Sequence, residues 1–281
     1  MTIAVTGASG QLGRLVIEQL KRRTTAGNIV ALVRNPAKAA DLGVQTRTAD
    51  YTQPATLERA LTGIDTLLLI SGNELGQRAT QHANVIAAAK KAGVKRIVYT
   101  SLLRADTSAL NLALEHRQTE ADLKASGIAW TFLRNGWYTE NYTGSIGAAL
   151  AHNAFHGSAR DGKIASAARA DYAEAAAVVL TTPGHDGKVY ELAGDAAYTL
   201  SDLAAEVSKQ SGKVIPYLDI PEADYAAALK QAGVPEGFAA AIASWDVSAA
   251  QGALFDDSGT LSRLIGHSTT SLAESVKQAL S

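Results

Sequence analysis

The chain has 281 residues, of which 47% are hydrophobic and 19% charged, with a formal net charge of −1. This composition is typical of a globular protein, and the near-zero charge excludes a general attraction to nucleic acid or to an anionic membrane. The absence of cysteine excludes disulfides, thiolate catalysis and cysteine metal sites. No stretch is apolar enough to span a bilayer and no signal-peptide pattern is present, so we expect a cytoplasmic protein.

A short apolar strand near the start of the chain runs into a glycine-rich turn, Thr6-Gly7-Ala8-Ser9-Gly10-Gln11-Leu12-Gly13, and a helical pattern follows. Gly7 allows the tight turn, Gly10 lets backbone approach a pyrophosphate, and Gly13 allows close packing of helix on sheet. The phosphates would lie at the positive end of the helix. The spacing resembles that of short-chain dehydrogenases, so Gly7, Ala8, Ser9, Gly10, Gln11 and Leu12 are predicted to bind a dinucleotide.

The second strand, residues 28–33, ends at Arg34, where NAD-binding proteins usually carry a carboxylate for the ribose. A guanidinium matches a 2′-phosphate instead, so Arg34 favours NADPH over NADH; a solvated arginine is the alternative. The third strand, residues 44–48, leads to Asp50. This residue is either a neighbour of the adenine or the start of the next turn.

Strands and helices alternate through the first half of the chain. Strands are expected at residues 66–71, 96–101 and 128–133, and helices at 55–61, about 85–92 and 112–126. This alternation predicts an α/β fold, a Rossmann-type doubly wound parallel sheet with helices on both faces. The expected NADP-binding domain covers residues 1–143.

Residues 144–281 are expected to form a smaller substrate-facing α/β lobe, from which some strands and helices can return to the main domain. Its predicted strands are residues 163–167 and 189–192, and its predicted helices are 169–180, 200–209, 222–232 and 271–280.

Ligands bind at the carboxyl ends of parallel strands, which nominates the residues that follow each strand. These candidates are Ser71, Gly72, Asn73, Thr100, Ser101, Asn135, Gly136, Trp137, Tyr138, Thr139, Glu140 and Asn141. Residues 135–141 are rich in aromatic and amide side chains, which suit a planar ring such as a quinone beside the nicotinamide. Asn73, Trp137 and Tyr138 are therefore the predicted substrate pocket, the alternative being that the aromatics only cover the core.

These motifs together resemble the NmrA-like atypical short-chain dehydrogenases. Tyr99-Thr100-Ser101-Leu102-Leu103 and Leu254-Phe255-Asp256-Asp257 are similar to segments of the bacterial NADPH-dependent quinone reductases of the second type within that family. The resemblance implies NADPH as cofactor, a quinone as substrate, and neither flavin nor metal. It places the dinucleotide contacts on residues 7–12, Arg34, the loop starting at Gly72, and residues 136–141.

The usual Tyr-x-x-x-Lys pair of short-chain dehydrogenases is missing. His116 and Glu120 stand where those two residues are expected. This argues against ordinary alcohol–ketone chemistry but not against hydride transfer to a quinone, whose reduced anion can take its proton from water. No catalytic residue is firmly assigned. His116 is a candidate proton donor oriented by Glu120, and an exposed His–Glu pair without a catalytic role is the simpler interpretation.

Other functions remain open on the sequence alone. The acceptor can be a triphenylmethane dye, an azo compound or another conjugated electrophile. A different class is a non-catalytic NADP-binding redox sensor, which needs no pocket beside the nicotinamide. The histidines show no metal-binding spacing, and the alanine-rich helices permit an oligomer without predicting one.

Overall fold

Seven strands form one parallel sheet in the order β3-β2-β1-β4-β5-β6-β8 in the computed structural model, which describes residues 1–281. They are β1 (Ile3–Val5), β2 (Ile29–Val33), β3 (Gln45–Thr48), β4 (Thr66–Leu69), β5 (Arg96–Leu102), β6 (Ala129–Asn135) and β8 (Val189–Leu192). All six neighbouring pairs are parallel. The strand order reverses between β1 and β4, which makes this the switch point where ligands bind in doubly wound sheets. The predicted Rossmann-type fold is confirmed.

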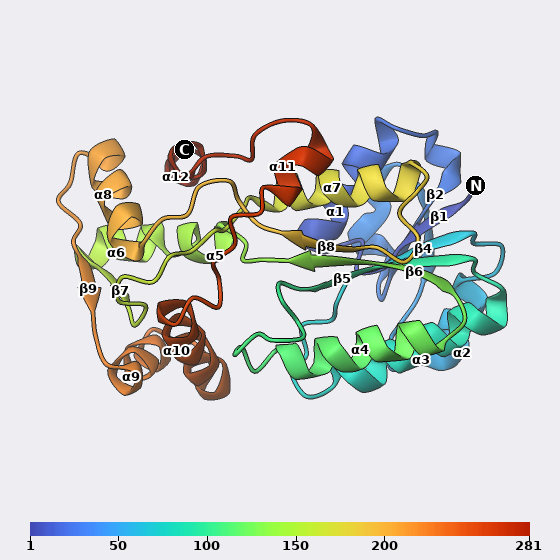
Figure 1. Ribbon diagram of the computed structural model, residues 1–281, viewed down its shortest axis with the longest axis horizontal. Coiled ribbons are helices and arrows are strands. Elements are labelled where there is room, and N and C mark those ends of the chain that lie inside the picture. Colours follow the sequence, from blue (N-terminus) through green and yellow to red (C-terminus); the bar gives the residue numbers. More distant parts are fainter.

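Two layers of helices enclose this sheet (Figure 1). The layer on one face contains α1 (Gln11–Lys21), α7 (Arg169–Thr181) and α11 (Thr260–Ile265), and the layer on the other contains α2 (Pro54–Ala60), α3 (Arg78–Ala92) and α4 (Ala113–Ala125). Alternate residues of the central strands therefore enter different cores. In β2, Ile29, Ala31 and Val33 join one core, while Val30 and Leu32 join the other. Burial on both faces explains why these strands are continuous apolar runs.

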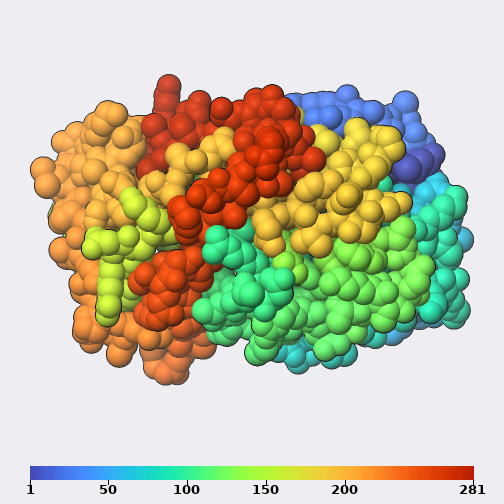
Figure 2. Space-filling view, viewed as in Figure 1, coloured from blue at the N-terminus to red at the C-terminus, as the bar shows by residue number.

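A third core lies beyond the carboxyl ends of the strands, in a smaller lobe. It is built from α5 (Glu140–Thr143), α6 (Ile146–His152), α8 (Leu200–Ser211), α10 (Glu236–Ala250), α12 (Leu272–Leu280) and the parallel pair β7 (Phe155–Gly157) and β9 (Tyr217–Asp219). In the same lobe, α9 (Glu222–Gln231) packs against α10 but has no buried residue. By contrast, α7, β8 and α11 return to the main sheet. Figure 2 shows the red C-terminal segment crossing the surface between the two parts. The division at residue 143 stays a prediction.

The predicted strand at residues 163–167 is wrong. This buried segment makes only two isolated bridges, from Ile164 to Tyr198 and from Ala167 to Tyr138, and no continuous ladder. The predicted ends of three main-sheet strands also move: β4 ends at Leu69, β5 reaches Leu102 and β6 reaches Asn135. Ser71 therefore lies in the loop after β4, whereas Asn135 belongs to a strand, as Thr100 and Ser101 do. No helix in the structure has the length and apolar character needed to cross a membrane.

Candidate active site

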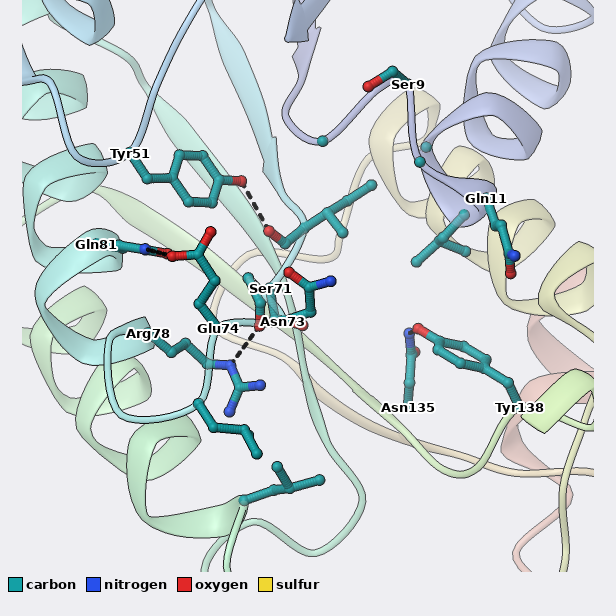
Figure 3. Close-up of a pocket in the computed structure, with 18 of the residues that line it drawn as sticks. Ser9, Gln11, Tyr51, Ser71, Asn73, Glu74, Arg78, Gln81, Asn135 and Tyr138 are labelled. Carbon is teal, nitrogen blue, oxygen red and sulfur yellow. Dashed lines mark hydrogen bonds between the residues drawn. The ribbon is translucent and has the colours of Figure 1, made fainter. Parts of the chain in front are cut away.

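A cavity of about 870 Å³ lies along the carboxyl ends of the main-sheet strands, within the range of roughly 300–1,000 Å³ found for ligand sites. Its wall begins at the glycine turn after β1, passes the loops after β2 and β4, and reaches α4, β6 and α10. Figure 3 shows Ser9, Gln11, Asn135 and Tyr138 on one side of the open space, and Tyr51, Glu74 and Arg78 on the other. The cavity thus runs from the loops after β1 and β2, where the sequence predicts the adenosine half of the cofactor, to the smaller lobe.

The glycine turn after β1 presents a site for an anion. Gly7 has a φ of +58°, and a Cβ on Gly13 would lie 2.4 Å from the carbonyl oxygen of Gly7, so both positions require glycine. Gly10 precedes α1 without a side-chain cap. The N–H groups of residues 11–13 have no partner within the protein, and they add to the positive end of an eleven-residue helix. This arrangement suits a pyrophosphate.

Arg34 lies at the adenosine end of the cavity, where Asn35 and Lys38 also line the wall. Its side chain is 72% exposed, and one guanidinium nitrogen lies 3.3 Å from a carboxylate oxygen of Glu74. Only this one nitrogen of the guanidinium is engaged, so the other donors remain free for a phosphate at this end of the cavity. Asp50 also lines the cavity, but its carboxylate accepts hydrogen bonds from the N–H and hydroxyl of Thr52. These bonds hold the pKa of Asp50 below its usual value.

The loop after β4 is held by buried side chains. The N–H of Gly72 donates to Nε2 of His82 over 3.0 Å, and Nε of Arg78 donates to the carbonyl of Gly72 over 2.8 Å. The N–H of Ser71 donates to the hydroxyl of Thr100 over 2.9 Å. Burial lowers the pKa of His82 to about 3, so it accepts as a neutral ring. The loop is thus fixed before any ligand binds.

His116 and Glu120 are not the exposed pair that the sequence favoured, nor does one orient the other. Their exposed fractions are 5% and 3%, and each bonds to a different residue of β5. Tyr99 and Ser101 lie two apart on one face of β5, opposite one face of α4. The hydroxyl of Tyr99 lies 2.7 Å from Nδ1 of His116, and that of Ser101 donates to Glu120 over 2.6 Å.

Glu120 is instead neutralised by Arg134 of β6. The guanidinium donates to both oxygens of Glu120, over 2.9 Å and 2.7 Å. It also donates to Glu191 over 2.8 Å and to Asp106 over 3.1 Å. The bond to Glu120 is the largest of the effects that raise the pKa of Arg134. This network fixes Ser101 in the cavity wall and leaves His116 independent of Glu120.

Aromatic side chains gather at the end of the cavity next to the smaller lobe. The rings of Trp137 and Trp245 meet edge-on with centroids 5.6 Å apart, and Phe238 meets Trp245 at 5.8 Å. The guanidinium of Arg169 lies 4.5 Å from the ring centre of Tyr138. These residues all line the cavity. Flat apolar walls of this kind accommodate a planar ring.

The structure brings most of the predicted site residues to one cavity. Those that line it are Gly7, Ser9, Gly10, Gln11, Leu12, Arg34, Asp50, Ser71, Gly72, Asn73, Ser101, His116, Asn135, Gly136, Trp137, Tyr138 and Asn141. Four predicted cofactor residues, Ala8, Thr100, Thr139 and Glu140, do not line it. Thr100 supports Ser71, Thr139 bonds to Ser166, and Glu140 accepts the N–H of Arg169.

Several lining residues were not predicted from the sequence. They include Tyr51, Glu74, Leu75, Arg78, Gln81, Leu112, Arg169, Phe238 and Trp245. Phe238 and Trp245 lie seven residues apart. This spacing puts both rings on one face of a helix and could have indicated from the sequence that they share a surface. An arginine at the start of a helix, such as Arg78, carries no such signal. No group of three or more His, Cys, Asp or Glu side chains is placed to hold a metal ion.

Comparison with known proteins gives full-length relatives. The chain is 62% identical to quinone oxidoreductase 2 of Escherichia coli strain K12, over 98% of this chain and 97% of that protein. The crystal structure of NADPH-dependent quinone oxidoreductase from Escherichia coli with NADPH matches 100% of both chains, with 61% identity and a TM-score of 0.97. That of the Citrobacter sp. triphenylmethane reductase with NADP(H) matches with 41% identity and a TM-score of 0.95, over 99% of this chain and 100% of that one.

A more distant relative and a family model agree with these matches. The chain is 28% identical to an NmrA-like family domain-containing oxidoreductase of Aspergillus flavus, over 100% of this chain and 95% of that protein. The NAD(P)H-binding family model matches residues 7–183. The resemblance expected from the motifs is confirmed, and the chain belongs to the NAD(P)H-binding family.

Proposed function

We propose that the protein is an NADPH-dependent quinone reductase that transfers hydride directly from NADPH to a quinone, without flavin or metal. The carrying observation is one continuous cavity that joins an anion site at α1 to an aromatic-walled end at α10. A dinucleotide bound along the strand ends would bring its reactive ring to the aromatic end. The relationship to the Escherichia coli enzyme supports the same reaction.

The residues present fit the cofactor. The unpaired N–H groups of residues 11–13 would hold the pyrophosphate, and Arg34 would hold the 2′-phosphate. The fixed loop from Ser71 to Asn73 and the segment from Asn135 to Tyr138 would enclose the other half. Residues 1–143 would thus supply the cofactor site, and residues 144–281 would complete the acceptor site. Bound NADPH supplies the hydride.

The task of the protein is mainly to position the acceptor. Trp137, Trp245 and Phe238 would hold a flat ring against the nicotinamide, and exclusion of water from this end would prevent side reactions. A quinone is electrophilic enough to accept hydride without an ionised acid, which agrees with the missing tyrosine–lysine pair. We also propose a cytoplasmic location, where NADPH is available, and a small-molecule quinone rather than nucleic acid as the binding partner.

Dye reduction is the second candidate, supported by the likeness to triphenylmethane reductase and by the three aromatic rings at the acceptor end. A non-catalytic sensor is the third, but a sensor needs no room beside the nicotinamide, whereas this cavity continues to the aromatic side chains of α10. Assays with NADPH and NADH, without added flavin or metal, against benzoquinones, naphthoquinones and a triphenylmethane dye separate the three. Turnover of quinones by NADPH supports the proposal; binding of NADPH without turnover of any acceptor favours the sensor.

A further inference from the structure

Tyr99 and His116 form an isolated hydrogen bond in the wall of the acceptor end. Tyr99 is fully buried in β5, and His116 is 5% exposed on α4. Burial raises the pKa of the tyrosine and holds the pKa of the histidine well below its usual value, so both are neutral near pH 7. Their hydrogen atoms can therefore be assigned from the bonding partners.

The bonding partners place the imidazole hydrogen of His116 on Nε2. The hydroxyl of Tyr99 has one hydrogen-bond partner within 3.5 Å, Nδ1 of His116 at 2.7 Å. A neutral phenol has one hydrogen and, when buried, must donate it. Tyr99 therefore donates to Nδ1, which is left without a hydrogen. Tyr99 thus fixes the tautomer of His116.

Nε2 of His116 has no partner within the protein. The buried polar side-chain atoms without partners are Arg96 Nε, Asn135 Oδ1 and Ser275 Oγ, so Nε2 of His116 is accessible rather than sealed. His116 lines the cavity together with Ser101, Leu112 and Trp137. The side chain therefore presents an N–H donor to the acceptor end.

The neighbouring His82 provides a contrast. The hydroxyl of Thr119 donates to the carbonyl of Glu115, so it accepts from Nδ1–H of His82. Nε2 of His82 in turn accepts from the N–H of Gly72. Both ring nitrogens of His82 are used inside the protein, and its tautomer is the opposite one. His82 is thus a structural residue, whereas His116 keeps one donor for a ligand.

We propose that neutral His116 is a catalytic residue that donates its Nε2–H to a carbonyl oxygen of the acceptor, and that Tyr99 is the positioning residue that sets this tautomer. The inference rests on the proposed quinone reductase function. In the step, the quinone gains a hydride, which is two electrons and one proton, and NADPH becomes NADP⁺. Negative charge develops on the oxygen bonded to His116, and water then supplies the second proton. His116 keeps its own proton throughout.

The test compares His116→Leu and His116→Gln with the exposed His152→Leu as a control for the loss of a histidine. Removing a donor to a developing oxyanion typically lowers kcat about 100-fold, so we expect a loss of that order in His116→Leu with the Kd for NADPH unchanged. Glutamine retains an N–H donor and should restore much of kcat. The defect should grow as the quinone becomes less electrophilic, which a purely structural role would not produce.

The positioning role of Tyr99 has a separate spectroscopic test. In ¹⁵N-histidine-labelled wild type, NMR should show His116 protonated at Nε2 only and His82 at Nδ1 only. Tyr99→Phe should mix the two tautomers of His116 and lower kcat, with a small effect on the KM for the quinone. Nδ1 protonation of His116 in the wild type would contradict the assignment, even if a variant fails to fold.

The outcomes separate this inference from the proposed function. Quinone turnover by wild type that His116→Leu leaves unchanged overturns the role of His116 alone. A His116→Gln variant that binds NADPH but is as slow as His116→Leu also contradicts the donor role. A wild type that turns over no quinone overturns the proposed function, and the catalytic role of His116 with it.

Discussion

Arg34→Gln is expected to weaken NADPH binding selectively. The substitution removes the charged fork that faces the 2′-phosphate site but keeps a side chain of similar reach. A hydrogen bond to a charged group contributes about 1.5–3 kcal/mol. In the free protein Arg34 is paired with Glu74, and both side chains are largely exposed, so giving up that pair costs about 0–1 kcal/mol. The net loss is about 0.5–3 kcal/mol, or roughly 2- to 160-fold in the Kd for NADPH.

The assay is calorimetric or fluorescence titration of wild type and variant with NADPH and with NADH. Affinity for NADH, which lacks the 2′-phosphate, should be nearly unchanged, and raising the salt concentration should narrow the difference for NADPH. Arg22→Gln is the matched control, because this exposed arginine follows the C-terminal end of α1, far from the glycine turn, and its loss changes the net charge equally. Equal weakening by the two substitutions, or unchanged NADPH binding in Arg34→Gln, would refute the reasoning.

Three further substitutions test other parts of the structure. Trp137→Ala should raise the KM for quinones about tenfold by removing one ring wall, while NADPH binding measured by titration stays close to wild type; the reverse pattern would contradict its placement. Arg134→Leu leaves the carboxylate of Glu120 buried and unpaired and should lower the free energy of unfolding in urea by about 3–5 kcal/mol; a change under about 1 kcal/mol would show that the network is dispensable. Burial raises the pKa of Asp246 to about 6, so ionisation of this carboxyl increasingly opposes folding as pH rises from about 4 to 6, and Asp246→Asn should be more stable than the wild type by about 1–3 kcal/mol at pH 7.5 and nearly equal to it at pH 4. Equal unfolding curves at pH 7.5 would contradict that assignment.

The main sheet could be predicted because its signals are local. A parallel strand covered on both faces is a continuous apolar run, and Gly7 and Gly13 mark a turn that no other residue can form. The segment 163–167, Lys-Ile-Ala-Ser-Ala, is less apolar, and whether it forms a ladder depends on neighbours that are distant in the chain. The pairing of β7 with β9 joins three-residue strands about 60 positions apart and has no local signal.

Prediction of the candidate site from the sequence is limited in the same way, because contacts between distant segments decide it. His116 and Glu120 have the helical spacing of a pair, and the sequence alone favours an interaction between them. Their partners are decided by the packing of α4 on β5, which brings Tyr99 and Ser101 against them. The segment around Trp137 was predicted as an acceptor wall from its composition. Its neighbours on α10, Phe238 and Trp245, lie about 100 residues later and reach the cavity only through the fold of the smaller lobe.

Direct hydride transfer in this cavity is tested most directly by an anaerobic titration of the purified protein, shown to be free of flavin and treated with a chelator. The account predicts that NADPH and a naphthoquinone are consumed in equal amounts and that a dihydroquinone is formed. NADH should react far more slowly. Turnover that appears only after flavin or a metal ion is added, or no consumption of NADPH with any quinone, would contradict the account.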